Sequence, residues 1–390
     1  MEISLSQRLG EVKEYYFSRK LQEIEQLMRQ GIEVINLGIG NPDMPPPAQM
    51  QMRLSEVNAQ NNSHGYQGYR GIQSLRIAFS NWYNLHLGVE LNADNEILPL
   101  SGSKEGIMHL SMALLNPSDR VLVPNPGYPT YSIATQLAGG IPVDYNLTES
   151  NDFEPDFDEL ELMDLSKVKL MWVNYPHMPS GAKGNLPLFE KLVQFAKKHH
   201  ILICHDNPYS FIMNDNPLSI LGVEGAKEVA VELNSLSKSH NMAGWRVGIL
   251  AGRSDIINAV LRFKSNMDSG MPLAVQQAAT AALAVGSEWY TSLNKEYAVR
   301  NVIATKIALA LNCTPSPKCQ GGIFLWARIP NWVYDVESFC DEVLKQTRVF
   351  ITPGTVFGSN GERYIRISLC ADKATLQIAL QRIETFDIHR

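Results

Sequence analysis

The sequence has few of the features that mark secreted, metal-binding or membrane-spanning proteins. Its five cysteines are scattered and form no Cys-x-x-Cys pair, which argues against a disulfide framework and against a zinc site. No apolar run reaches the ~20 residues that a membrane-spanning helix needs. Residues 1–20 contain acidic side chains and no continuous apolar stretch. We therefore expect no signal peptide and a cytoplasmic protein without a bound metal.

Positive charge is also scarce, because 34 lysines and arginines face 40 aspartates and glutamates, a net charge of -6. No basic block occurs anywhere in the chain. This balance argues against a nucleic acid or a membrane surface as the partner. The apolar fraction of 45% and the charged fraction of 19% are ordinary for a globular protein. The length predicts two or three domains of roughly 150 residues each.

Short apolar strands alternate with helices through the middle of the chain. This alternation predicts an α/β fold with a mostly parallel sheet, covered by helices on both faces. The strands are expected at residues 97–100, 121–123, 169–173, 201–204, 229–233 and 247–251. Helices are expected at residues 5–29, 186–199 and 336–347, among others. After Pro272, long helices and then further strands predict a smaller α+β domain. We expect a large cofactor-binding domain at 46–275 and a C-terminal small domain at 276–390, with the N-terminal helix and crossing loop of residues 1–45 as part of the small domain.

One lysine lies in unusually uncharged surroundings. Lys238 follows an apolar strand and stands in a run of small hydroxyl residues. Burial lowers the pKa of a lysine, and a neutral amine can form a Schiff base with an aldehyde. The hydroxyls of Ser235 and Ser237, with the planar cation of Arg246, suit a phosphate group. These residues predict a lysine that holds pyridoxal phosphate, although an ordinary lysine in a strand-to-loop turn fits the same stretch.

Other glycine-rich and hydroxyl-rich motifs are weaker when each is taken alone. Gly102 and Ser103 open a helix and offer backbone amides to an anion, or the serine is a simple helix cap. Gly38 permits close approach of the backbone to a ligand, or forms a plain turn. Several of these motifs follow an apolar strand, and ligands of open α/β sheets bind at that edge. The motifs therefore support one another.

Taken in this order, the motifs resemble those of the class I/II aminotransferases, the aspartate-aminotransferase-like enzymes of the type I pyridoxal phosphate fold. The resemblance covers about residues 36–368. It depends above all on Asp206-x-x-Tyr209, followed by Ser-x-Ser-Lys238 and Arg246. It implies transfer of an amino group from an α-amino acid to a 2-oxo acid, through pyridoxal and pyridoxamine phosphate in turn.

The resemblance also implies a role for each residue around the cofactor. Lys238 would form the Schiff base and then carry the proton between substrate and cofactor. Asp206 would pair with the pyridine nitrogen and keep the ring a good electron acceptor. Tyr209 would donate a hydrogen bond to the phenolic oxygen, and Tyr128 would stack on the ring. The phosphate would be held by Gly102, Ser103, Lys104, Ser235, Ser237, Arg246 and, from the neighbouring subunit of a homodimer, Tyr66.

On the substrate side, the resemblance implies that Arg366 grips the α-carboxylate with two hydrogen bonds. Gly38 would support that carboxylate through its backbone, and Ile39 and Asn174 would complete the substrate site. Asn174 would also contact the cofactor. The segment at 38–43 resembles those of LL-diaminopimelate aminotransferases and of broad-range alanine or aromatic aminotransferases.

Two positions depart from the family pattern. Met178 stands where the family has an asparagine whose amide donates to the phenolic oxygen of the cofactor. Loss of a hydrogen bond to a charged group costs roughly 1.5–3 kcal/mol, so we expect a raised pKa of the internal imine unless Asn174 or water replaces the donor. Pro208 stands where a small residue is usual under the ring, and is expected to tilt the ring slightly.

Two other functions are compatible with the same scaffold. A β-eliminating C–S lyase would use the same cofactor and release ammonia, pyruvate and a thiol without a 2-oxo acid. A non-catalytic regulator of this fold would carry a basic DNA-binding domain at its N-terminus, for which we expect no room before Asn36.

Overall fold

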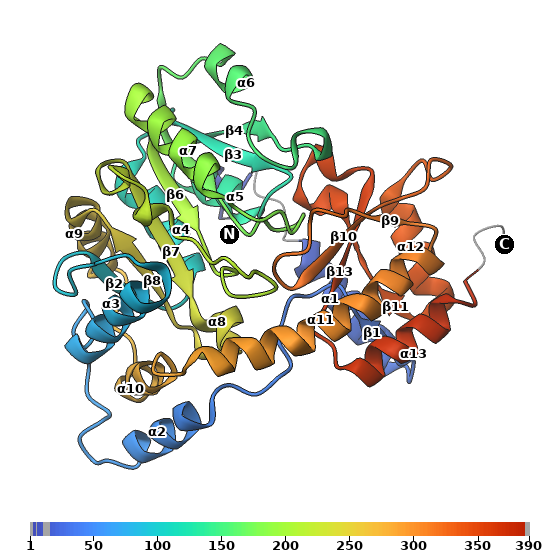
Figure 1. Cartoon of the computed structure of the whole chain (residues 1–390), viewed down its shortest axis with the longest axis horizontal. Coiled ribbons are helices and arrows are strands. Elements are labelled where there is room, and N and C mark those ends of the chain that lie inside the picture. The colour runs from blue at the N-terminus through green and yellow to red at the C-terminus, as the bar shows by residue number, and fades with distance from the viewer. Residues whose placement is uncertain (1–2, 5, 11–15, 387–390) are drawn as a thin grey trace.

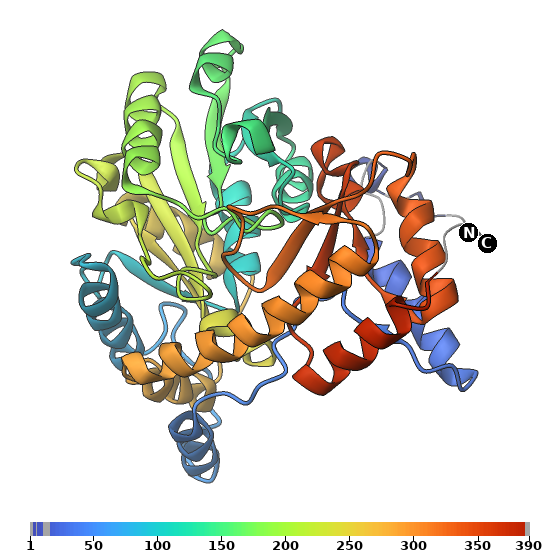
Figure 2. The ribbon, with the colours of Figure 1, turned by 45° about the vertical axis from the view of Figure 1, so that its right-hand side comes forward.

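A computed structural model describes residues 3–4, 6–10 and 16–386. Figure 1 shows a larger part built around a central sheet, and a smaller part that contains the C-terminal helices and strands. The long helix α11 (Ser287–Ala310) runs from one part to the other, as Figures 1 and 2 both show. Among the described residues, none of the helices combines the length and apolar character that crossing a bilayer requires.

The larger part contains a seven-stranded sheet in the spatial order β2-β8-β7-β6-β5-β3-β4. Neighbouring strands are parallel except around β8, which is antiparallel to both β2 and β7. The expected mostly parallel sheet is thus confirmed. The strands are β2 (Ile97–Leu100), β3 (Arg120–Asn125), β4 (Ile141–Asn146), β5 (Val168–Val173), β6 (Leu202–Asp206), β7 (Ala230–Ser235) and β8 (Gly248–Gly252).

The central strands of this sheet are buried on both faces, which explains why β5 and β6 are largely continuous apolar runs rather than alternating ones. In β5, Leu170 and Trp172 enter one apolar cluster while Met171 and Val173 enter another. The first cluster includes side chains of α4, α5 and α9, and the second includes side chains of α3 and α7. The helices of this part are α2 (Ala48–Asn58), α3 (Gln73–Leu87), α4 (Ser103–Leu114), α5 (Thr130–Leu137), α6 (Phe157–Leu162), α7 (Leu186–His199), α8 (Leu236–Ser239), α9 (Ser254–Lys264) and α10 (Leu273–Ala282).

The smaller part has an antiparallel sheet in the order β12-β13-β10-β9. A separate parallel pair joins β1 to β11, so the chain near residue 35 belongs to this part before it crosses to α2. The domain boundaries themselves stay a prediction. The elements are α1 (Tyr16–Arg29), β1 (Ile35–Asn36), β9 (Thr314–Pro315), β10 (Phe324–Arg328), α12 (Val336–Thr347), β11 (Val349–Phe350), β12 (Thr352–Pro353), β13 (Tyr364–Ser368) and α13 (Lys373–Ile383).

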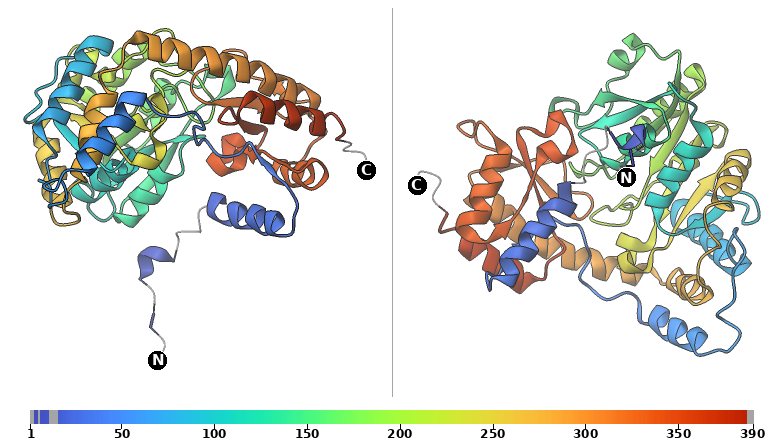
Figure 3. Two further views of the ribbon diagram at one scale, coloured as in Figure 1. Left: turned by 90° about the horizontal axis from the view of Figure 1, so that it is seen from below. Right: turned by 180° about the vertical axis from the view of Figure 1, so that it is seen from behind.

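Helix α1 lies against the smaller part, as both views of Figure 3 show. The buried amine of Lys20 on α1 forms an ion pair with Asp341 of α12, at 2.9 Å between Nζ and Oδ1. One helix over residues 5–29 was expected; instead a 3₁₀ turn precedes α1, and residues 5 and 11–15 lie outside the described residues. The 3₁₀ helices are η1 (Gln7–Leu9), η2 (Glu149–Asn151), η3 (Ile220–Gly222), η4 (Ala226–Glu228), η5 (Ala243–Trp245), η6 (Gly354–Phe357) and η7 (Ser359–Gly361).

Candidate active site

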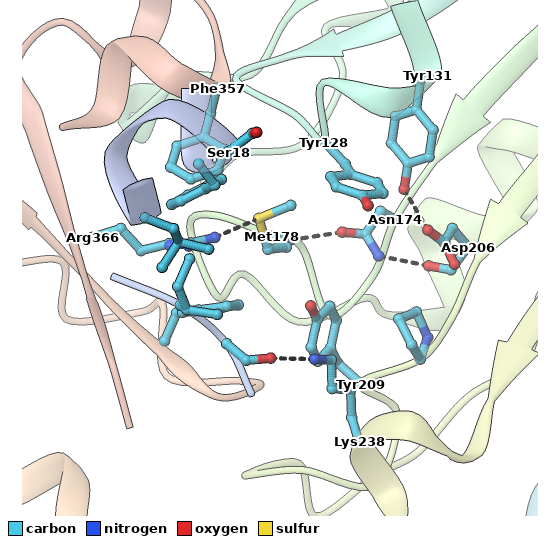
Figure 4. Close-up of a pocket in the computed structure, with 16 residues that line it drawn as sticks. Ser18, Tyr128, Tyr131, Asn174, Met178, Asp206, Tyr209, Lys238, Phe357 and Arg366 are labelled. Carbon is cyan, nitrogen blue, oxygen red and sulfur yellow. Dashed lines mark hydrogen bonds between the residues drawn. The ribbon is translucent and has the colours of Figure 1, made fainter. Parts of the chain in front are cut away.

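A cavity of about 440 Å³ lies where the two parts meet. The larger part lines it with side chains that follow the carboxyl ends of β5, β6 and β7, and the smaller part lines it from β10 and β13. Figure 4 shows these side chains pointing into a common space. Of the predicted site residues, the cavity wall includes Ile39, Tyr128, Asn174, Asp206, Tyr209, Lys238 and Arg366.

Lys238 reaches the cavity from α8, directly after β7. Its Nζ donates a hydrogen bond to the carbonyl oxygen of Gly40, in the segment that crosses between the two parts. Burial lowers the pKa of Lys238 to about 8, and the positive charges of Arg366 and Arg246 act in the same direction. Close to neutral pH, a useful fraction of this amine is therefore uncharged and nucleophilic.

Asp206 is the last residue of β6 and is buried. Its Oδ2 accepts a hydrogen bond from the Tyr131 hydroxyl at 2.8 Å, while its Oδ1 has no hydrogen-bond partner among the described residues. Burial raises the pKa of Asp206 to about 6, against the opposing effect of the Tyr131 hydrogen bond. A buried carboxylate oxygen without a donor is costly, so the site favours a ligand that brings a proton to it.

Sequence reasoning did not identify Tyr131. The sequence offered only a weak signal: Tyr131 follows Tyr128 by three residues, but Tyr128 precedes α5, so helical spacing does not place both side chains on one face. The two rings meet edge to face, with centroids 5.6 Å apart. Tyr128 therefore lies beside the residue that holds Asp206 in place.

Asn174 ties together two segments of backbone at the cavity. Its Nδ2 donates to the carbonyl oxygen of Asp206 at 2.6 Å, and its Oδ1 accepts from the backbone N–H of Met178 at 2.7 Å. The thioether sulfur of Met178 lies 3.2 Å from Nη1 of Arg366. The side chain that replaces the family's asparagine thus lies between Asn174 and the arginine (Figure 4).

Arg366 is buried on β13 in a cage of aromatic rings. Its guanidinium carbon lies 3.8 Å from the ring centroid of Phe324, 4.5 Å from that of Phe357 and 5.4 Å from that of Phe17. Aromatic faces attract a cation without neutralising it. Its Nη2 donates to the carbonyl oxygen of Gly38 at 2.6 Å, so the predicted pair of Gly38 and Arg366 does come together.

The three aromatic residues of this cage were missed by sequence reasoning. Phe17 belongs to α1, Phe324 to β10 and Phe357 to η6. They are far apart in the sequence and form no motif, so only the tertiary fold brings them together.

The residues predicted to hold a phosphate gather around the start of α4. Gly102 has a φ of +87°, and a Cβ there would collide with the guanidinium of Arg246. The start of β8 packs against the amide nitrogen of Ser103 and the carbonyl oxygen of Asn234, so the α4 and α8 loops are neighbours. Amides, hydroxyls and a cation therefore surround one place, which is a suitable arrangement for an anion.

Within this group, the side chains also bond to one another. The hydroxyl of Ser235 donates to Oγ of Ser237 at 2.8 Å and accepts from the Ser237 amide at 3.1 Å. Lys104, at the start of α4, has its Nζ 6.0 Å from the ring centroid of Tyr128. Tyr66 is 94% exposed and, like the residues predicted to hold the phosphate, is not part of the cavity wall. Its action in a neighbouring subunit stays a prediction.

A cavity at the carboxyl edge of a helix-covered parallel sheet is the usual site of an enzyme that acts on small molecules. The model of the family "Aminotransferase class I and II" matches residues 32–383. The chain therefore belongs to the class I and II aminotransferases. It is 40% identical to an LL-diaminopimelate aminotransferase of Dehalococcoides mccartyi, over 98% of this chain and 99% of the relative. It is 39% identical to that of Moorella thermoacetica, over 97% of both chains.

Solved structures agree with this assignment. The substrate-bound BacF structure from Bacillus subtilis superposes with a TM-score of 0.93 at 37% identity, over 98% of both chains. A mutant aspartate aminotransferase of Thermus thermophilus superposes with a TM-score of 0.91 at 23% identity, over 98% of this chain and 99% of that one, and supports the fold alone.

The chain is thus an aminotransferase, with an amino acid and a 2-oxo acid as the substrates that its relatives imply. This confirms the function predicted from the motifs and favours it over the C–S lyase and the non-catalytic regulator. Enzymes of this family generally use pyridoxal phosphate.

Proposed function

We propose that this aminotransferase holds pyridoxal phosphate on Lys238 and binds the substrate α-carboxylate with Arg366. The observation that carries the proposal is the buried Asp206, whose Oδ1 has no partner among the described residues, in a cavity that also contains the Lys238 amine. A protonated pyridine nitrogen would donate to that oxygen. The group formed by Gly102, Ser103, Ser235, Ser237 and Arg246, called the anion cradle below, suits the phosphate. The residues therefore fit the cofactor at its ring nitrogen, its aldehyde carbon and its phosphate.

When bound, pyridoxal phosphate supplies a ring that accepts the electron pair left on the substrate Cα. Lys238 provides the amine that takes the proton from Cα and returns it, and its pKa of about 8 suits both steps. Asp206 holds a proton on the ring nitrogen. The hydrogen bond from Tyr131 keeps the carboxylate in one orientation for that purpose.

The aromatic cage prepares Arg366 for the substrate. The rings of Phe324 and Phe357 cover the guanidinium with apolar surface and exclude water. A charge–charge interaction is stronger where water is excluded, so an α-carboxylate is bound firmly and in one orientation. Asn174 and Met178 close the cavity between this arginine and Asp206.

Covalent attachment at Lys238 is tested by borohydride reduction of protein that has been incubated with pyridoxal phosphate. Peptide mass spectrometry should find the adduct on Lys238 in the wild type and lose it in Lys238→Ala. Protein that stays colourless with the cofactor, or an adduct confined to other lysines, would contradict the proposal.

For the amino donor, we infer LL-diaminopimelate as the first candidate, because the relatives at 37–40% identity over the whole chain carry that name. A panel of LL-diaminopimelate, alanine, aspartate and aromatic amino acids with 2-oxoglutarate would identify the donor. Mixing the loaded enzyme with one amino acid alone provides a second test. Stoichiometric conversion to the pyridoxamine form supports transfer, whereas continuous release of ammonia and pyruvate would indicate a lyase.

A further inference from the structure

Next to the start of α4 lies a partly buried group of charges, centred on Lys264, that the proposed function does not use. Lys264, the last residue of α9, has only 1% of its side chain exposed. Its Nζ lies 2.9 Å from Oε1 of Glu105 and also forms an ion pair with Asp268. A buried lysine is costly unless it is paired, so its place at this position needs an explanation.

Glu105 connects this lysine to the cradle. It belongs to the first turn of α4, and its Oε1 also bonds to Nε2 of His109 at 2.8 Å. Its other oxygen, Oε2, accepts a hydrogen bond from the backbone N–H of Ser101. Ser101 directly precedes Gly102 and Ser103, the residues that open α4. The carboxylate therefore joins α9 to the loop that would receive the phosphate.

Arg246 of the anion cradle holds the loop at residues 101–103 from the other side. The carbonyl oxygen of Ser101 accepts from Nη2 of Arg246 at 3.4 Å, and Nη1 of the same arginine donates to the carbonyl oxygen of Ala243 at 2.9 Å. Both polar groups of the Ser101 backbone are thus engaged, its N–H by Glu105 and its carbonyl by Arg246. Loss of either contact would leave the loop free to turn its amides away.

The charge of Glu105 makes this arrangement unusual. A carboxylate close to a phosphate site repels the ligand, so it needs a compensating cation. Burial alone would raise the pKa of Glu105, but hydrogen bonds from His109 and Lys264 outweigh burial and hold the pKa below its usual range. Lys264 therefore keeps Glu105 ionised and in place, and offsets its negative charge.

We propose that Lys264 and Glu105 are positioning residues for the cofactor phosphate. Lys264 orients Glu105, and Glu105 holds the loop at residues 101–103 in the shape that presents its amides to the phosphate. Neither side chain lines the active-site cavity. The proposal rests on the proposed use of pyridoxal phosphate.

The test compares two ligands that differ only in the phosphate. Affinities of the apo protein for pyridoxal phosphate and for pyridoxal are measured by absorbance titration, for the wild type, Lys264→Met and Glu105→Gln. We expect the variants to bind pyridoxal phosphate roughly 10- to 100-fold more weakly, by analogy with the loss of affinity when residues that orient metal ligands are changed. Their affinity for pyridoxal should stay within about threefold of the wild type, and Lys264→Arg should restore part of the loss.

Lys198→Met is the matched control, because Lys198 forms an ion pair of similar length with Glu161 on an exposed surface. It should leave both affinities unchanged. An equal loss of affinity for both ligands would indicate general damage to the fold and overturn the proposal, as would unchanged binding of pyridoxal phosphate. If Lys264→Met does not fold, Glu105→Gln alone decides, because it keeps the size of the side chain.

The results that would refute the proposed function differ from those that would refute the positioning role. A wild type that does not bind pyridoxal phosphate, or that gives no borohydride adduct on Lys238, would refute the use of the cofactor itself. A wild type that binds, with variants that bind equally well, refutes only the positioning role.

Discussion

Asp206 should destabilise the apo protein, and Asp206→Asn should therefore make that apo protein more stable near neutral pH. Burial raises the pKa of this carboxyl group to about 6, whereas an unfolded chain has an aspartate pKa of about 3.9. The difference of about two pKa units corresponds to about 3 kcal/mol. Because the folded state binds the proton more tightly, stability falls as the pH rises from about 4 to about 6, and the full cost persists above that range.

The asparagine of the variant does not ionise, and its amide oxygen can still accept the hydrogen bond from Tyr131. At pH 7.5 we expect apo Asp206→Asn to exceed the apo wild type in free energy of unfolding by up to about 3 kcal/mol. The gain should shrink toward pH 4.5, where the wild-type carboxyl group is protonated. Saturating pyridoxal phosphate should reverse the order, because only the wild type can pair a carboxylate with the protonated ring nitrogen.

Urea unfolding of both apo proteins at pH 4.5, 6 and 7.5 measures the difference directly. The exposed Asp215 offers a matched control, since Asp215→Asn makes the same chemical change on a side chain at the surface. A gain in stability that does not vary with pH would refute the reasoning, because it would have to arise from packing. So would an apo variant less stable than the wild type at pH 7.5.

The geometry of the cavity supports three further experiments. Tyr131→Phe removes a hydrogen bond to a charged group, worth ~1.5–3 kcal/mol, and should raise the pKa of Asp206 by ~1–2 units in a carbon-13 titration of the apo protein. The rate at which apo protein takes up pyridoxal phosphate should rise with pH around a midpoint near 8, since only the uncharged Lys238 amine reacts; a flat profile would contradict this. Met178→Asn restores the donor of the family and should lower, by ~1–2 pH units, the midpoint of the pH-dependent visible absorbance of the loaded enzyme.

Much of the fold could be predicted because local sequence and tertiary burial agree. The bounds predicted for α7 and α12 are those observed, Leu186–His199 and Val336–Thr347. Strands β5 and β6 are apolar runs buried on both faces, so they are recognisable without knowledge of their neighbours. Edge strand β4 was not predicted, because apolar and polar residues follow no regular period along it and Pro142 is unusual within a strand.

The candidate site likewise has one part that the sequence predicts and another part that it does not. Asp206 is the last residue of one buried strand and Lys238 follows the next strand by three residues, and the topology of a parallel sheet brings such positions to one edge. Their proximity therefore follows from the order of strands and motifs along the chain. The cage around Arg366 depends instead on α1 packing against the smaller part, and nothing in the local sequence near residue 17 specifies that contact.

The cage and Met178 together explain how this chain can lack the family's asparagine. An asparagine at position 178 could offer Arg366 an amide oxygen, which is a strong hydrogen-bond acceptor, whereas a thioether sulfur is a weak one. Nη1 of Arg366 lies 3.2 Å from that sulfur, so a carboxylate bound by Arg366, as we propose for the substrate, would displace a weak partner. Phe324 and Phe357 keep the guanidinium in place without competing for its N–H groups. On the proposed function, Met178 would thus remove one hydrogen-bond donor to the cofactor and at the same time leave Arg366 easier for the substrate to reach.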